Sequence, residues 1–176
     1  MEILAFSGSL RAASTNRAVL HAAARLAPAG LRIHLYSGIA DLPHFNPDLE
    51  KALPDTVRDL RARVGAADGL LISTPEYAYG VPGSLKNALD WLVGGDEFLH
   101  KPVALFNASQ RATHAHDSLC TTLRIMAGRL VDEACVTLPL IGRRLDEQGI
   151  AADPALAAQL RAALVAFQRA IEHPPQ

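Results

Sequence analysis

A short stretch near the N-terminus, FSGSLRAASTNRAVL over residues 6–20, gathers hydrogen-bond donors between two apolar segments. The apolar run 3–6 leads into it, and apolar residues return at helical spacing behind it. A strand–loop–helix junction of this kind presents backbone amides and a helix N-terminus, which together favour an anion. Arg11 can add a charge-assisted contact and Asn16 can turn inward, and hydroxyl groups come from Ser7, Ser9, Ser14 and Thr15. This donor set fits a phosphate monoester.

The same residues also fit an ordinary loop rich in Ser and Thr, in which Ser14 or Asn16 caps the following helix. Two common phosphate-binding patterns are excluded. The dinucleotide fingerprint G-x-G-x-x-G needs glycines that the isolated Gly8 does not supply, and the P-loop pattern G-x-x-x-x-G-K-[ST] is absent. The stretch therefore predicts a phosphate site or a helix cap, but neither a Rossmann fold nor a nucleoside triphosphatase.

A second unusual stretch, PEYAYGVPG at residues 75–83, follows an apolar run. Tyr77 and Tyr79 offer flat apolar surface with a polar tip, which suits contact with a planar ring. Gly80 and Gly83 permit a positive φ or a close approach of the backbone. We expect this loop to hold a planar ring through backbone groups and aromatic edges. The alternative is a plain turn with tyrosines on the surface.

The segments that must position these loops alternate between strands and helices. Strands are predicted at 3–6, 31–36, 68–74, 101–107 and 133–138, and helices at 16–27, 54–64, 84–92, 119–130 and 156–171. This alternation is typical of a parallel sheet covered on both faces. The simplest α/β solution is a flavodoxin-like three-layer sandwich, with a five-stranded parallel sheet in the order 2-1-3-4-5. Ligands then bind at the carboxyl ends of strands one and three, where both unusual loops lie.

Bulk properties restrict the classes of function. A chain of 176 residues suits one domain, 1–176, and its net charge of −1 favours neither nucleic acid nor a membrane as a partner. No apolar run is long enough to span a bilayer or to act as a signal peptide, so we expect a cytoplasmic protein. Cys120 and Cys135 have no metal-ligand spacing, and His114 and His116 lack a third ligand, so no metal site is expected.

Both loops resemble one known family. The segments GSLRAASTNR (8–17) and PEYAYGVPGSLKNALDWL (75–92) are similar to the patterns G-S-L-R-x-x-S-x-N and P-E-Y-N-x-x-x-P-G-x-L-K-N-A-I-D-W. These patterns are those of the NADPH-dependent FMN reductases, flavodoxin-like flavoproteins that include quinone reductases, chromate reductases and azoreductases. The resemblance implies an FMN cofactor, with NADPH or NADH as co-substrate. Hydride would pass through FMN to a small acceptor such as a quinone in a ping-pong order.

The resemblance also implies which residues contact the cofactor. The phosphate would be held by Ser9, Arg11, Ser14 and Asn16, beside the Thr15 hydroxyl, and the ring would be lined by Pro75, Glu76 and Tyr77. Ala78 departs from the family pattern, which has Asn there. A third loop, NASQRATHAHDS, lacks the glycines of the family, but Ser109 fits, and Arg111 could contact the flavin edge or a nucleotide phosphate. A solvated Arg111 is the alternative.

No catalytic residue is predicted, because the cofactor would carry the hydride chemistry. Two other functions remain open at this point. A flavodoxin-type electron carrier is one, although such carriers are strongly acidic and have the loop T/S-x-T-G-x-T. A flavin-free interaction domain is the other, and Ala78 is its best support. The resemblance further implies a homodimer or homotetramer, with a small-molecule electron acceptor as the partner in the reaction.

Overall fold

A parallel β-sheet forms the centre of the computed structural model, which describes residues 1–174. The last two residues of the predicted domain, 175–176, lie outside this range. The strand order is β2-β1-β3-β4-β5, which confirms the predicted order 2-1-3-4-5. The strands are β1 (Glu2–Ser7), β2 (Arg32–Leu35), β3 (Gly69–Ser73), β4 (Pro102–Asn107), β5 (Arg129–Leu130) and β6 (Val136–Thr137).

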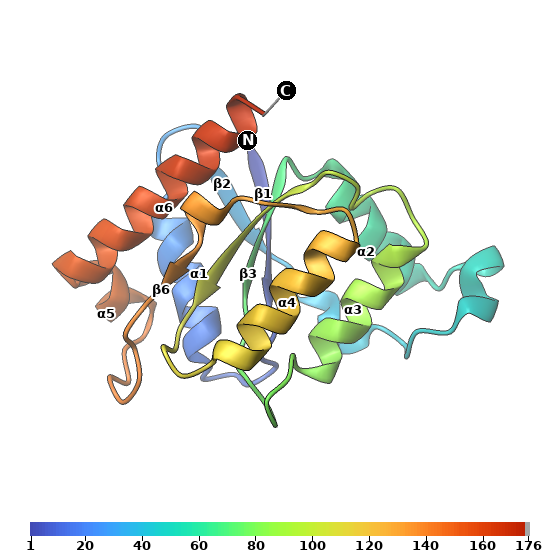
Figure 1. The fold of residues 1–176 in the computed structure, drawn as a ribbon, viewed down its shortest axis with the longest axis horizontal. Helices are drawn as coiled ribbons and strands as arrows, with labels where there is room; N and C mark the ends of the chain where they lie inside the picture. Colours follow the sequence, from blue (N-terminus) through green and yellow to red (C-terminus); the bar gives the residue numbers. More distant parts are fainter. Residues whose placement is uncertain (175–176) are drawn as a thin grey trace.

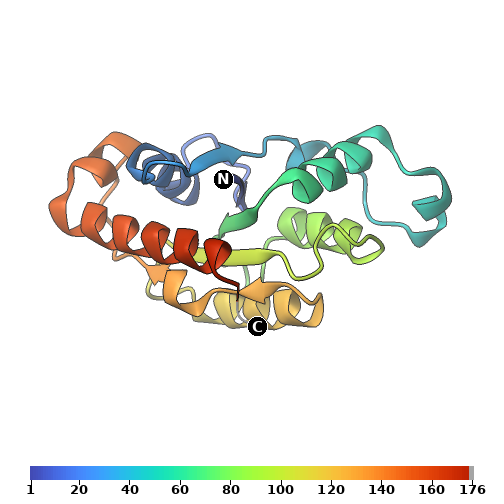
Figure 2. The same cartoon turned by 90° about the horizontal axis from the view of Figure 1, so that it is seen from above.

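Helices cover both faces of the sheet and complete the three layers (Figures 1 and 2). One face carries α1 (Thr15–Leu26), α5 (Glu147–Ala152) and α6 (Pro154–Glu172); the other carries α2 (Asp55–Ala66), α3 (Gly83–Val93) and α4 (Thr113–Ile125). Side chains of β1 alternate between the two cores, as the pleat of a strand requires. Ile3 and Ala5 pack toward α1 and α6, whereas Leu4 and Phe6 pack toward α2 and α3.

The segment between the predicted strand 31–36 and the predicted helix 54–64 contains two short 3₁₀ helices, η1 (Gly38–Asp41) and η2 (Pro47–Ala52). Figure 1 shows η2 projecting beyond α2 and α3. The segment is fixed to α3 because the indole N–H of Trp91 and the amide of Asn87 both donate to the carbonyl of Pro43, at 2.7 and 2.9 Å. The segment is therefore docked on the core rather than free in solvent.

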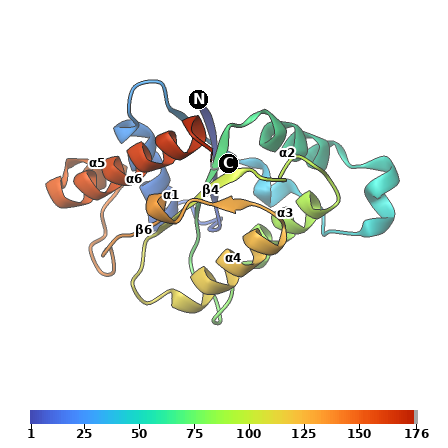
Figure 3. The ribbon, with the colours of Figure 1, turned by 45° about the horizontal axis from the view of Figure 1, so that its top comes forward.

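The fifth strand position differs from the predicted strand 133–138. It is filled by β5 beside the start of β4 and by β6 beside its end, with a 3₁₀ turn, η3 (Asp132–Ala134), between them (Figure 3). The thiol of Cys135 lies at this interruption and accepts the backbone N–H of Leu105 at 3.4 Å. Burial raises the pKa of that thiol to about 11, so it stays protonated at neutral pH.

The helix predicted over 119–130 ends earlier, at Ile125. Ala127 takes a φ of +60°, and its N–H bonds back to the carbonyl of Arg124 at 3.0 Å, which closes the last turn. Gly128 follows, and a Cβ there would lie 2.5 Å from the ring of Phe98. The glycine therefore allows the chain to pass the ring and enter β5.

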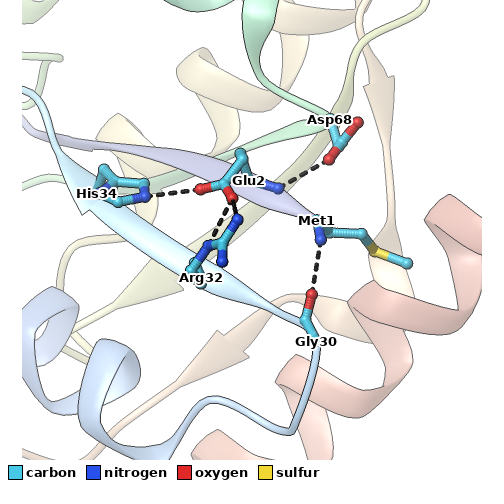
Figure 4. Close-up of polar contacts among 6 residues, drawn as sticks. All are labelled: Met1, Glu2, Gly30, Arg32, His34 and Asp68. Carbon is cyan, nitrogen blue, oxygen red and sulfur yellow. Dashed lines mark hydrogen bonds and ion pairs between the residues drawn. The ribbon is translucent and has the colours of Figure 1, made fainter.

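The amino ends of the strands carry a set of mutually satisfied charges, which we call the amino edge (Figure 4). The carboxylate of Glu2 accepts from the guanidinium of Arg32 and from His34, and the N–H of Glu2 donates to Asp68 at 2.7 Å. The ammonium of Met1 donates to the carbonyl of Gly30 at 2.6 Å. The loops at the opposite ends form the carboxyl edge, at the bottom of Figure 1. Across residues 1–174, no helix has the length and apolar character needed to cross a bilayer.

Candidate functional site

Two neighbouring cavities lie at the carboxyl edge. The first cavity has a volume of about 480 Å³ and is lined by segments 15–16, 74–76, 108–112 and 140–144. The second cavity, of about 720 Å³, lies between segments 11–21 and 144–147. Thr15 and Arg144 line both, so the two spaces adjoin. The loops that sequence reasoning placed at the carboxyl ends of β1 and β3 thus meet around one hollow.

The first loop is shaped by its own hydroxyl groups. Ser14 is the N-cap of α1, and its Oγ accepts the N–H of Arg17 at 3.3 Å, which confirms the capping interpretation for this residue. Ser9 is buried, and its Oγ accepts the N–H of Arg11 at 3.4 Å. Asn16 is also buried and accepts the hydroxyl of Ser73 at 3.0 Å. Three of the predicted phosphate donors therefore also hold the loop in shape.

Gly8 brings the first loop against the end of β3. A Cβ at this position would lie 2.1 Å from Oγ1 of Thr74 and 2.7 Å from its Cβ. Such distances are far inside van der Waals contact, so only glycine permits this approach. The close packing brings the first loop against Thr74, which lines the first cavity.

The predicted cofactor residues divide between the cavities. The first is lined by Thr15, Asn16, Pro75, Glu76, Ser109 and Arg111. The second is lined by Arg11, Ser14 and Thr15. Ser9 instead lines a smaller hollow of about 180 Å³ beside Tyr36. Tyr77 and Ala78 line neither cavity, and Tyr77 is half exposed at the tip of its loop.

The tip of the second loop is a tight turn. Tyr77 and Gly80 exchange both backbone hydrogen bonds, at 3.1 and 3.0 Å, and the two residues between them, Ala78 and Tyr79, have φ of +49° and +61°. Two consecutive positive φ values define a type I′ turn, which favours Asn or Gly. Neither Gly80 nor Gly83 takes a positive φ, and a Cβ at either position would have no neighbour closer than 3.7 Å, so neither glycine is used for a left-handed backbone or a close approach here. The Asn of the family pattern at position 78 suits the left-handed backbone better than Ala78.

Glu76 joins the second loop to the third. Its Oε2 accepts the N–H of Ala115 at 2.9 Å, in the first turn of α4, whose own N-cap residue, Ala112, has no side-chain acceptor. The carboxylate therefore caps α4 from another loop, and its negative charge interacts favourably with the positive end of the helix dipole. Beside it, the rings of Tyr79 and His114 stack edge to face at 4.8 Å. The two walls of the first cavity are thus tied together.

The third loop presents Arg111 to the first cavity. The Oγ of Ser109 accepts the N–H of Arg111 at 3.1 Å, and the N–H of Ser109 donates to Asn107 at 3.0 Å. These bonds fix the backbone, while the guanidinium remains exposed at the cavity wall. No carboxylate within residues 1–174 forms an ion pair with Arg111.

Sequence reasoning missed the segment 139–146, which supplies a fourth wall of the first cavity. Leu140 and Ile141 contribute apolar surface there, and Arg144 borders both cavities. The signal was Pro139 followed by Gly142, which marks a turn directly behind the last strand; Gly142 has a φ of +77°. A loop at the carboxyl end of the fifth strand belongs to the same edge as the other three.

The charges around the cavities favour an anion. Arg11, Arg17, Arg111 and Arg144 line them, together with the N-terminus of α1, and the acids Asp146 and Glu147 also line the second cavity. The one carboxylate at the first cavity, Glu76, is engaged with the start of α4. Within the described chain, no cluster of three or more His, Cys, Asp or Glu side chains is arranged to hold a metal ion. The first cavity therefore suits an anionic ligand, to which Leu140 and Ile141 also offer apolar surface.

Both a family model and individual proteins of known type match this sequence. The sequence model of a family described as NADPH-dependent FMN reductase matches residues 1–141. A quinone reductase of Escherichia coli is 42% identical over 94 residues, which cover 52% of this chain and 50% of that protein. An NAD(P)H-dependent FMN reductase of Pseudomonas aeruginosa is 42% identical over 112 residues, covering 62% and 60%. The matched region thus spans about half the length of the first of these relatives.

Among solved structures, a flavoenzyme NAD(P)H:(acceptor) oxidoreductase from Paracoccus denitrificans superposes with a TM-score of 0.78. It is 30% identical, and the alignment covers 97% of both chains. An NADH:FMN oxidoreductase in its apo form superposes with a TM-score of 0.68 at 23% identity, a likeness that concerns the fold. The match to the family model and the full-length likeness to the first structure both include the two loops of the carboxyl edge.

Proposed function

Because this chain belongs to the NADPH-dependent FMN reductase family, we propose that it is an FMN-dependent NAD(P)H oxidoreductase acting on a small acceptor such as a quinone. In this proposal residues 1–176 form a single FMN-binding domain. The observation that carries it is the first cavity, where the two motif loops meet at the point of strand-order reversal. That is the ordinary binding place of sheets of this type.

The residues present fit FMN. The first amides of α1, at Thr15 and Asn16, and the guanidinium groups of Arg11 and Arg111 suit a phosphate monoester. Pro75 and Glu76 line the first cavity, as do the apolar residues Leu140 and Ile141. Ser9 and Ser14 support the phosphate loop from within through their hydrogen bonds. Tyr77 and Ala78 shape the turn at the rim.

When bound, FMN supplies the hydride chemistry between the nicotinamide and the acceptor. The protein contributes binding, orientation and charge. Arg111, without a carboxylate partner in the described chain, places a positive charge at the cavity wall, where it favours negative charge on a ligand. We propose that the nicotinamide and the acceptor bind one after the other at the same exposed face of the flavin, which gives ping-pong kinetics. We also propose that no side chain acts as a nucleophile.

The first test is spectroscopic. The purified protein is expected to show flavin absorbance or to gain it on reconstitution with FMN, and anaerobic NADPH should bleach that absorbance. Bleaching distinguishes a reductase from an electron carrier without its own nicotinamide reaction. A protein that takes up no FMN under any of these conditions would contradict the proposal and favour a flavin-free interaction domain.

Arg111→Ala tests the site itself. Loss of a charge-assisted contact is expected to weaken FMN binding about tenfold or more, measured by quenching of flavin fluorescence. The matched control is Arg161→Ala, since Arg161 is exposed on α6 and lines neither cavity. Equal FMN affinity in both variants would show that Arg111 is merely a solvated side chain.

We also propose a cytoplasmic homo-oligomer, a dimer or tetramer. Several large apolar side chains are exposed at the carboxyl edge, namely Leu10, Tyr77, Tyr79 and Ile141. Exposed apolar groups near a ligand site are typical of a surface that another protein covers. Light scattering in solution measures the mass directly, and a monomer at micromolar concentration would contradict this part of the proposal.

A further inference from the structure

The first cavity is bordered by the N-termini of two helices. Thr15 and Asn16, the first two residues of α1, line it, and so do Arg111 and Ala112, which lead into α4. The positive end of a helix dipole and the first N–H groups of a helix together favour an anion. A ligand with a single phosphate therefore meets two helix ends in one cavity, and each would turn the rest of the ligand in a different direction.

The two helices differ in the charge of their caps. Neither has an acidic residue in its own first turn. The cap of α1 is the neutral hydroxyl of Ser14, whose Oγ accepts the N–H of Arg17 at 3.3 Å. The cap of α4 comes from another loop, since Oε2 of Glu76 accepts the N–H of Ala115 at 2.9 Å. The positive end of α1 is thus left for a ligand, whereas a carboxylate offsets that of α4.

The carboxylate of Glu76 is held at the start of α4 and is not neutralised by a side chain. In the part of the chain that the structure describes, Glu76 forms no ion pair with a lysine, arginine or histidine. The turn that follows it is closed by the two backbone hydrogen bonds between Tyr77 and Gly80. The ring of Tyr79 in this turn stacks on that of His114 in the first turn of α4. The negative charge therefore lies at one fixed place on the cavity wall.

We propose that Glu76 determines the orientation of the ligand, because its carboxylate excludes phosphate from the start of α4 and leaves α1 as the place where phosphate binds. Like charges repel, and the N–H of Ala115 already has its acceptor. A repulsive group of this kind selects between two arrangements without adding a contact to the preferred one. The inference rests on the proposed function, because FMN carries its phosphate at one end and its ring at the other.

Inorganic phosphate tests the charge without the flavin. Phosphorus NMR of the FMN-free protein at low ionic strength, where charges are least screened, measures how many phosphates bind to each chain. The wild type is expected to bind one, which FMN displaces. Glu76→Gln keeps an oxygen that can accept the N–H of Ala115 but removes the charge, so a second phosphate should bind. Glu133→Gln, at an exposed acid that lines neither cavity, is the matched control and should bind one.

The melting temperature separates the charge from the cap. Glu76→Ala loses both, so it should bind a second phosphate and also melt at a lower temperature than Glu76→Gln. The same number of phosphates in the wild type and in Glu76→Gln would overturn the inference, whatever Glu76→Ala does. In that case the bond to Ala115 would matter for the fold alone.

The FMN-loaded protein supplies a second measurement. Anaerobic NADPH should bleach all of the bound flavin of the wild type in one phase. In Glu76→Gln, the fraction of FMN bound in the reverse orientation should react at least about tenfold more slowly, since its ring is misplaced. A single phase in both proteins would overturn the role in orientation. If the protein takes up no FMN, the proposed function fails, whereas the phosphate titration still decides whether Glu76 keeps anions away from α4.

Discussion

Charged side chains have partners at the amino edge of the sheet, whereas arginines at the carboxyl edge do not. At the amino edge, Glu2 satisfies Arg32 and His34 with its carboxylate and Asp68 with its N–H (Figure 4). At the carboxyl edge, Arg111 and Arg144 border the cavities with no acidic partner in the described chain. Both edges are exposed, so solvent alone does not explain the difference.

The contrast separates charges that complete the fold from charges that await a ligand. A satisfied surface cluster adds little to stability, and its members can be exchanged at small cost. An arginine without an acidic partner beside a cavity gives the folded state no stability from an ion pair, but it raises the affinity of the cavity for an anion. Mutations at the amino edge should therefore change stability slightly and binding not at all. Mutations at the carboxyl edge should change binding and, where the backbone is crowded, stability as well.

The strongest challenge to this contrast is Gly8→Ala. The added methyl group would meet Thr74 at the end of β3, so we expect the free energy of unfolding to fall by about 2 to 3 kcal/mol, together with FMN affinity. Denaturant unfolding measures the first effect. Gly83→Ala is the control, because no atom lies within 4 Å of the added group. Similar losses in both variants would mean that the edge is not crowded at Gly8.

A smaller effect of opposite sign is expected for Ala78→Asn. Asn tolerates the left-handed conformation that Ala78 adopts, so the variant should be more stable by about 1 kcal/mol. The melting temperature provides the measurement, and Ala29→Asn, at an exposed position without a positive φ, should show no gain. If Ala78→Asn instead melts earlier, the turn is not under the strain that its φ values indicate.

The smallest effect concerns the amino edge. Hydrogen bonds from Arg32 and then His34 lower the pKa of Glu2 from 4.5 to about 2. A carboxyl group whose pKa is lower in the folded state stabilises the fold above its unfolded pKa, and this contribution is lost as the pH falls. Glu2→Gln should thus flatten the pH dependence of the urea midpoint between about pH 4.5 and 2. Glu133→Gln, at an exposed acid without an ion pair in the described chain, should leave that dependence unchanged.

Local patterns in the sequence predicted the order of the elements and the position of the site. The apolar runs and their alternation with helical segments were sufficient for the strand order, because few topologies satisfy a parallel sheet with covered faces. The two motif loops could be placed at the carboxyl edge for the same reason. Gly128 marked the end of α4, but the apolar spacing continued past it to Leu130 and hid the boundary.

What could not be predicted depends on contacts between distant residues. The carboxylate of Glu76 caps a helix 39 residues later, and no local pattern announces that bond. Ser9 lines a small hollow that Tyr36 also lines and neither of the two larger cavities, and its place in the motif does not indicate this. The fifth strand is interrupted by η3, and Cys135 directly behind it accepts the N–H of Leu105 on the neighbouring strand. These features depend on tertiary contacts, which cannot be predicted from local patterns in a single sequence.

The bond between Glu76 and Ala115, together with the stacked rings of Tyr79 and His114, also has a mechanical consequence. These contacts join the second loop to the start of α4, and both border the first cavity. The start of α1, which also lines it, is held to the end of β3 by the hydrogen bond from Ser73 to Asn16. Residues 139–146 form another wall of this cavity; the chain passes through Gly142 with a φ of +77°, and Arg143 pairs with Asp153. That wall is thus held to the start of α6 by a salt bridge whose two residues line neither cavity.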